Sequence, residues 1–292
     1  MSPELHQTVA TLEDNMARVV LGKRDVVRLC IVALLAGEHI LLEDVPGVGK
    51  TLIGKALAKS VDAKFCRIQF TPDLLPSDIV GSSVFNGKTN EFFYSQGPIF
   101  ANIVLADEIN RTTPRTQSAL LEAMSDNQVS ADGHTYPLPE SQLDRFLLRT
   151  SVGYPDREDE LRVLTSHRRG EPVEELRSVI STQQVVDMQE AVRSVTVDDS
   201  IHEYLLDLVD ATRRSDDLHV GVSTRGTLAL YRAAQSLAFI EGRDFVIPDD
   251  IKRLAVPVLG HRVIAKGFLT GNSRDHVENI VQRLLGEVAV PQ

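Results

Sequence analysis

Two glycines followed by a lysine and a threonine stand where an apolar run gives way to a helical pattern. The segment reads Pro46-Gly47-Val48-Gly49-Lys50-Thr51 and lies between the apolar run 39–42 and the helical pattern 52–58. Glycines let a backbone wrap around phosphates, and the N–H groups at a helix start supply positive potential. In such a loop Lys50 reaches the outer phosphates and the Thr51 hydroxyl can ligate Mg²⁺. The segment, continued by Leu52, therefore predicts a binding site for ATP or GTP.

One residue departs from the usual phosphate-loop pattern, G-x-x-x-x-G-K-[ST]. That pattern places its first glycine at position 44, where this chain has Asp44. The alternative interpretation is a chance glycine-rich turn after a strand. The strand-to-helix setting favours the phosphate loop, and a second motif downstream favours it further.

That second motif is a pair of carboxylates at the end of an apolar run, Ala101-Asn102-Ile103-Val104-Leu105-Ala106-Asp107-Glu108. We interpret the run as a buried strand. Phosphoryl transfer needs metal, nucleophile and phosphate in one geometry, so we expect Asp107 to hold Mg²⁺ and Glu108 to polarise the attacking water. An acidic strand end that faces solvent is the alternative, and it is common where no phosphate loop is present.

Composition indicates an ordinary globular chain of two domains. It has 292 residues, of which 42% are apolar and 25% are charged, and no apolar stretch has the length needed to span a bilayer. The first residues lack the basic and apolar regions of a secretory signal, so we expect a cytoplasmic location. The net charge of −10 argues against strong nucleic-acid binding. The eight histidines and two cysteines show no zinc-ligand spacing, which leaves Mg²⁺ as the expected metal.

The periodicity of apolar residues predicts an α/β domain followed by a helical one. After a helical region at 4–37, strand-like runs at 39–45, 64–70, 101–107 and 146–152 alternate with helical patterns at 51–60, 114–125 and 155–167. Such alternation calls for a parallel sheet with helices on both faces and a ligand at the carboxyl ends of the strands. Further helices are expected at 225–241, 249–258 and 274–288, with capping boxes that begin at Ser181 and Ser200. The predicted domains are 1–155, the nucleotide-binding core, and 156–292, a smaller all-helical lid.

These motifs, in this order, resemble the MoxR branch of the AAA+ ATPases. The resembling blocks cover most of the chain and lie at 43–51, 68–78, 97–111, 117–124 and 143–146. The resemblance implies a P-loop AAA+ fold and a Mg²⁺-dependent ATPase that remodels protein clients as a chaperone. It also implies a protein partner with a von Willebrand factor A domain.

The resemblance assigns two arginines to the site. Arg225 matches sensor 2, whose guanidinium touches the γ-phosphate, although a helix-start arginine in a surface ion pair would look the same. Arg145 matches the arginine finger that reaches the neighbouring subunit, which implies a homo-oligomeric ring, expected to be a hexamer. Residues 71–100 resemble the helix-2 insert, and residues 126–138 resemble the hairpin before sensor 1. In this family both face the pore of the ring.

A strand of the family is missing from this chain. MoxR-type chains place an apolar strand, the sensor-1 asparagine and a loop between the hairpin and the Leu-Asp-Arg-Phe block, whereas here Tyr136-Pro137-Leu138-Pro139-Glu140 runs almost directly into Leu143. Its loss would leave two inner sheet edges unpaired. The explanations are a natural deletion, a sequence that omits residues of the natural chain, or a rearrangement in which 146–152 or 126–138 fills the gap. Nucleotide binding is therefore a firmer prediction than turnover.

Three other functions stay open at this point. The chain could be a nucleotide-binding interaction subunit with impaired hydrolysis, because the sensor-1 segment is missing. A nucleic-acid motor is disfavoured by the acidic balance, and a small-molecule kinase by the long helical lid with Arg225 and the 143–146 block. No Asn-Lys-x-Asp segment is present, which favours ATP over GTP.

Overall fold

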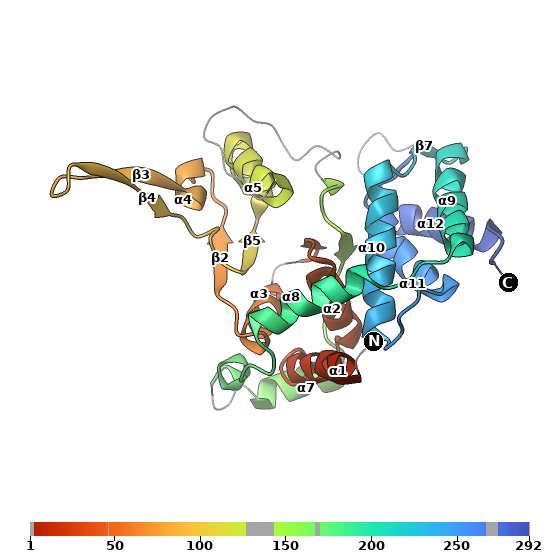
Figure 1. Ribbon diagram of the computed structural model, residues 1–292, viewed down its shortest axis with the longest axis horizontal. Coiled ribbons are helices and arrows are strands. Elements are labelled where there is room, and N and C mark those ends of the chain that lie inside the picture. Colours follow the sequence, from red (N-terminus) through yellow and green to blue (C-terminus); the bar gives the residue numbers. More distant parts are fainter. Residues whose placement is uncertain (1–2, 46, 127–142, 167–169, 267–273, 292) are drawn as a thin grey trace.

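The computed structural model describes residues 3–45, 47–126, 143–166, 170–266 and 274–291 (Figure 1). The first half of the chain, up to residue 150, contains both helices and strands. They are α1 (Pro3–Ala17), α2 (Arg24–Ala36), β1 (Ile40–Leu42), α3 (Lys50–Ser60), β2 (Phe65–Gln69), α4 (Pro76–Val80), β3 (Gly81–Asn86), β4 (Glu91–Gln96), β5 (Ile103–Asp107), the 3₁₀ turn Ile109–Arg111, α5 (Pro114–Asp126) and β6 (Leu148–Thr150). The four predicted strands and the helices between them are thus present, and the fold is α/β.

The parallel strands form two separate pairs in the part of the chain that the structure describes. β1 pairs with β6, with Leu41 opposite Arg149, and β2 pairs with β5, with Gln69 opposite Asp107. No hydrogen-bonded ladder joins β1 to β5 among the described residues. The described sheet is thus divided between the β1–β6 pair and the β2–β5 pair, which agrees with the expected loss of an inner strand, and 146–152 does not fill the gap. The predicted hairpin at 126–138 falls almost wholly outside the described residues.

The second half of the chain is predominantly helical. Its elements are α7 (Arg157–Ser166), the 3₁₀ turn Pro172–Glu175, α8 (Thr182–Arg193), α9 (Asp199–Arg214), β7 (Leu218–Val220), α10 (Thr224–Ile240), α11 (Pro248–Leu259), β8 (Ile264–Ala265) and α12 (Arg274–Glu287). The structure adds a short antiparallel pair, β7 with β8, that the helical patterns did not predict. Strands of three and two residues are too short to show a periodicity of their own.

Two helix starts show how local sequence sets the boundaries. Ser181 caps α8 through its side chain, and the Gln184 side chain accepts from the Ser181 N–H, so this capping box is confirmed. The capping box predicted at Ser200 is wrong. Asp198 caps α9 instead, since its carboxylate accepts from the Ser200 N–H at 2.9 Å.

The buried side chains form one large and one small cluster. The large cluster joins α1, α2, α3 and β6 to the helices of the second half, with Tyr204 and Leu208 of α9 buried in it. The small cluster consists of Ile68, Phe70, Ile79, Val80, Ala119 and Leu120, from β2, α4 and α5 with the residues beside them. The small cluster therefore packs against the β2–β5 pair, whereas the large cluster packs against the β1–β6 pair and also contacts Ile103 of β5.

The hairpin of β3 and β4 projects away from the rest of the molecule, as Figure 1 shows at its left. It lies within the predicted insert at 71–100. Phe92, near the turn between β3 and β4, is 74% exposed, and its ring packs against Phe85 at a centroid distance of 5.2 Å. Whether this hairpin faces a pore stays a prediction.

Candidate functional site

The phosphate-loop segment occupies the junction between β1 and α3. Gly49 precedes the first residue of α3 with a φ of 94°, and Gly47 has a φ of 89°, backbone conformations that glycine adopts without strain. A Cβ built on either glycine would meet nothing within 4 Å, so both face open space. This is the room that a phosphate chain needs beside a helix N-terminus. Pro46 lies outside the described residues.

The side chains after the glycines start α3. The Lys50 ammonium donates to the Asp44 carbonyl at 2.8 Å and to the Val45 carbonyl at 3.2 Å, which folds the lysine back along its own loop. Thr51 is half-buried in the first turn, and Leu52 packs against the large core cluster, as does Val48 of the loop. The loop therefore presents Lys50 and Thr51 at the end of a helix that the core holds in place.

The acidic pair lies at the carboxyl end of β5, where it meets side chains from β2. Arg67 donates to the Asp107 carboxylate at 2.5 Å, and Gln69 donates to the Glu108 carboxylate at 2.7 Å. Arg111 also lies 3.1 Å from Glu108, whose φ of 57° is uncommon for a residue with a side chain. Both carboxylates thus have protein partners in this structure.

Sequence reasoning missed the two partners on β2. Arg67 and Gln69 are two residues apart on a strand, so their side chains share one face, and the parallel register places that face beside the end of β5. The alternation on β2 was visible in the sequence, but the register that brings it to Asp107 was not.

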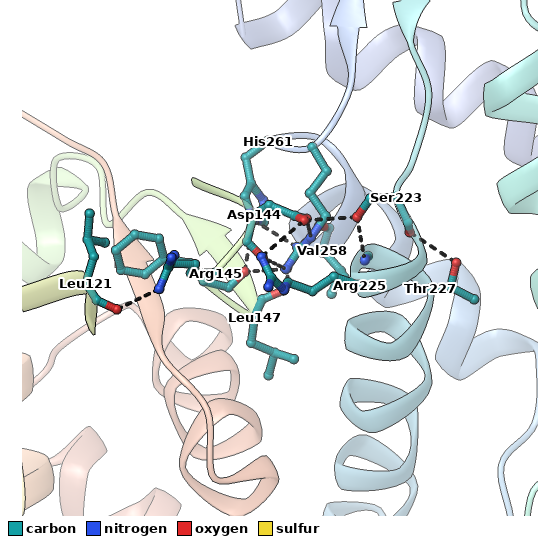
Figure 2. A network of polar contacts seen from close by, with 12 residues as sticks. Leu121, Asp144, Arg145, Leu147, Ser223, Arg225, Thr227, Val258 and His261 are labelled. Carbon is teal, nitrogen blue, oxygen red and sulfur yellow. Dashed lines mark hydrogen bonds and ion pairs between the residues drawn. The ribbon is translucent and has the colours of Figure 1, made fainter. Parts of the chain in front are cut away.

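The two predicted arginines have different partners, and only Arg225 approaches the carboxylate of Asp144 (Figure 2). Arg225, in the first turn of α10, lies 3.8 Å from Asp144 Oδ2, and the Ser223 hydroxyl donates to the same oxygen at 2.9 Å. Arg145 points the other way and donates to the Leu121 carbonyl of α5 at 2.7 Å.

A third arginine, Arg262, holds this segment and was missed by sequence reasoning. Its side chain is only 1% exposed, and its Nε donates to Asp144 Oδ1 at 2.8 Å. The guanidinium also donates to the carbonyls of Phe146 and Leu147. Burial lowers the pKa of Arg262, while the charge of Asp144 opposes that shift. A single buried guanidinium therefore ties the segment 144–147 to the loop after α11.

The residues predicted from the sequence fall into three groups: the phosphate loop, the acidic pair and the two arginines. None of the hydrogen bonds and ion pairs described above joins one group to another, and the two arginines have different partners. The Thr51 hydroxyl and the Asp107 carboxylate are hard oxygen donors of the kind that Mg²⁺ prefers, so the residues fit a magnesium ion together with phosphate.

Comparison with known proteins identifies the family. Residues 39–138 match the model of the ATPase family associated with various cellular activities (AAA), and residues 210–283 match the AAA lid domain. The chain is 36% identical to the protein named Chaperone MoxR1 of Mycobacterium tuberculosis, over all of this chain and 84% of that protein. This chain is a MoxR-type AAA+ ATPase family member.

One further sequence relative and one crystal structure are similar to this chain over almost its full length. YeaC of Bacillus subtilis is 47% identical, over 99% of this chain and 96% of YeaC. A crystal structure of a protein from Cytophaga hutchinsonii superposes with a TM-score of 0.86 at 33% identity, over 99% of this chain and 96% of that chain.

Alignment lengths bear on the missing strand. The alignment with YeaC is 309 positions long, against 292 residues in this chain, so at least 17 residues of YeaC match nothing here. The alignment with MoxR1 is longer still, at 325 positions. Both comparisons agree with a segment that relatives have and this MoxR-type chain lacks.

None of the described helices is both long and apolar enough to cross a membrane.

Proposed function

We propose that this chain is a Mg²⁺-dependent ATPase that remodels protein partners as a ring. The observation that carries the proposal is the phosphate loop at the junction of β1 and α3, with its two positive-φ glycines facing open space. Family membership implies nucleotide binding, and ATP is the nucleotide that we assign to the site.

The proposed ligand contacts are assigned from the two sequence motifs and from the family resemblance. Lys50 and the N-terminus of α3 bind the phosphates, and Thr51 and Asp107 hold the Mg²⁺ ion, which supplies electrostatic stabilisation of the transferred phosphoryl group when bound. Glu108 orients and polarises the attacking water. Because Arg67 donates to Asp107 in this structure, that contact has to be exchanged when the metal binds.

The proposed ring follows from the arginine assignments. Arg225 would touch the γ-phosphate of its own subunit, and Arg145 would serve a neighbouring subunit after leaving the Leu121 carbonyl. We infer a hexamer, protein clients and a partner with a von Willebrand factor A domain from the family resemblance, and the name of MoxR1 as a chaperone supports the choice of clients. The cytoplasmic location, the domain boundary at 155 and the absence of strong nucleic-acid binding stay predictions.

A second function, a nucleotide-binding interaction subunit with weak hydrolysis, has two observations in its favour. No strand pairs with β1 on the side away from β6 in the described parts of the chain, and relatives contain residues that this chain lacks. The missing segment would carry the sensor-1 asparagine. Such a subunit would bind ATP and change partner contacts without efficient turnover.

Steady-state ATP turnover with Mg²⁺, measured over a wide range of protein concentration, tests the first function. Lys50→Ala removes the phosphate contact and should abolish turnover, whereas Lys55→Ala is a matched control in the same helix. Lys55 instead lies 3.5 Å from Glu171, in an exposed pair whose loss costs little.

Three outcomes decide between the functions. Turnover that rises with protein concentration and is lost only in Lys50→Ala supports an assembling ATPase. Binding of ATP without turnover, lost only in Lys50→Ala, supports the interaction subunit. Equal behaviour of the Lys50 and Lys55 variants would refute the proposed site.

A further inference from the structure

Asp44 stands where the usual phosphate-loop pattern has glycine, and its carboxylate is fully engaged. Oδ2 accepts hydrogen bonds from the Ser151 hydroxyl at 2.7 Å and from the Gly153 N–H at 2.6 Å. Oδ1 accepts from the Val45 N–H at 2.8 Å. A glycine at this position would make none of these bonds. The side chain therefore fastens the start of the loop to the segment that leaves β6.

The main chain of Asp44 holds the phosphate-binding lysine of the proposed site. The Asp44 carbonyl accepts from the Lys50 ammonium at 2.8 Å. One residue thus contacts the exit of β6 through its carboxylate and Lys50 through its carbonyl. Burial on its own raises the pKa of the Asp44 carboxyl, but the hydrogen bonds from Gly153, Ser151 and Val45 outweigh burial and lower that pKa below its usual value.

The hydrogen bonds from Asp44 to the 151–153 segment matter because the sheet is divided next to β1. β1 is bordered by β6 on one side, and no described strand borders it on the other. The loop that follows β1 contains two glycines with φ near 90°, which are the residues with the most conformational freedom. A loop of this kind loses entropy when a ligand orders it, and any contact that orders it beforehand reduces that loss.

We propose that Asp44 is a positioning residue, which fastens the phosphate loop to the 151–153 segment and so places Lys50 for nucleotide binding. This proposal rests on the proposed nucleotide site. It adds a residue that the motif itself does not predict. Asp44 touches no phosphate in this arrangement and acts through Lys50 and the backbone of the loop.

The test measures the affinity for MgADP by calorimetry, in the wild type and in Asp44→Asn. Asn keeps the shape of Asp, but its NH2 group must face either the Val45 N–H or the two donors at Ser151 and Gly153, so at least one of these hydrogen bonds is lost. We expect affinity to fall about tenfold, which corresponds to ~1.4 kcal/mol. Ser151→Ala, which removes one donor and leaves Asp44 in place, should lower affinity by less. Asp62→Asn, an exposed aspartate after α3, serves as the control and should leave affinity unchanged.

A double-mutant cycle with Lys50→Ala separates positioning from support of the fold. If Asp44 acts through Lys50, Asp44→Asn has little further effect on affinity in the Lys50→Ala background. A tenfold loss that persists in that background, or unchanged affinity in both Asp44→Asn and Ser151→Ala, would overturn the proposal. Should Asp44→Asn not fold, the same cycle is made with Ser151→Ala.

The proposed site and the proposed role of Asp44 fail in different ways. Binding of MgADP by the wild type that Lys50→Ala weakens and the Asp44 and Ser151 variants leave unchanged overturns only the role of Asp44. No binding by the wild type overturns the nucleotide site, and the role of Asp44 with it.

Discussion

Acidification should destabilise the fold through one buried histidine, His261, which follows α11. The side chain is 7% exposed, and its Nε2 lies 3.0 Å from the Phe146 carbonyl. Burial, and then the charge of Arg262, lower its pKa to about 3, with Arg149 acting in the same direction. In the unfolded chain a histidine has a pKa of about 6.5. Between these two pKa values His261 is therefore protonated in the unfolded state and neutral in the folded state.

The sign and size of the effect follow from linkage between protonation and folding. A base whose folded pKa is depressed carries no penalty above its unfolded pKa, and the folded state loses stability as the pH falls below about 6.5. The loss is ~1.4 kcal/mol per pH unit until the folded pKa is approached. Between pH 6.5 and pH 5 the free energy of unfolding should fall by about 2 kcal/mol from His261 alone. Carboxyl groups with lowered pKa values, such as Asp44 and Glu241, contribute stability above their unfolded values near 4 and lose it only below that range.

Urea unfolding monitored at several pH values between 7.5 and 5 measures this slope. His261→Gln can keep a hydrogen bond to the Phe146 carbonyl but cannot titrate, so it should show a much flatter dependence than the wild type. If the wild type and His261→Gln lose stability in parallel over this range, the burial argument for His261 is refuted.

Two further substitutions probe the packing of the second half of the chain. A Cβ at Gly226 in α10 would lie 2.7 Å from Val222 Cγ1 and 2.8 Å from Arg262 Cδ, so Gly226→Ala should displace Arg262 and lower the free energy of unfolding by about 1–3 kcal/mol, despite the better helix propensity of Ala. Urea unfolding of this variant at neutral pH checks that, and a stabilised protein would contradict it. Leu208 of α9 is fully buried, so Leu208→Ala should cost about 2–5 kcal/mol in the same assay, and a cost below that of a surface substitution would place Leu208 outside the core.

The sequence predicted the elements and missed the contacts that depend on three-dimensional neighbours. Strands and helix starts have local causes, such as Pro114 at the start of α5 and the capping box at Ser181, so they could be read from the chain. The Ser200 prediction failed because Asp198, two residues earlier, is also a good cap. Aspartate and serine have similar N-cap preferences, so the sequence pattern alone does not show whether Asp198 or Ser200 caps α9.

The contacts of the candidate site have non-local causes. Asp144 meets Arg262 across 118 positions of sequence, and Arg67 meets Asp107 across 40. Such pairs depend on strand register and on how the second half packs, and a single sequence shows neither. The missing strand is the exception, because the short passage from Glu140 to Leu143 was visible in the sequence, and the divided sheet agrees with it.

The divided sheet also places the two halves of the proposed site on different cores. The phosphate loop follows β1, which packs with the large cluster, and the acidic pair ends β5, which packs partly with the small one. Helix α3 contacts both β2 and β5, and it begins at Lys50. Gly54 of α3 approaches Phe65 of β2 so closely that a Cβ there would lie 2.9 Å from the ring. Because α3 both presents Lys50 and touches the strand pair that carries Asp107, the distance between phosphate and metal contacts depends on this single helix more than it would in an unbroken sheet.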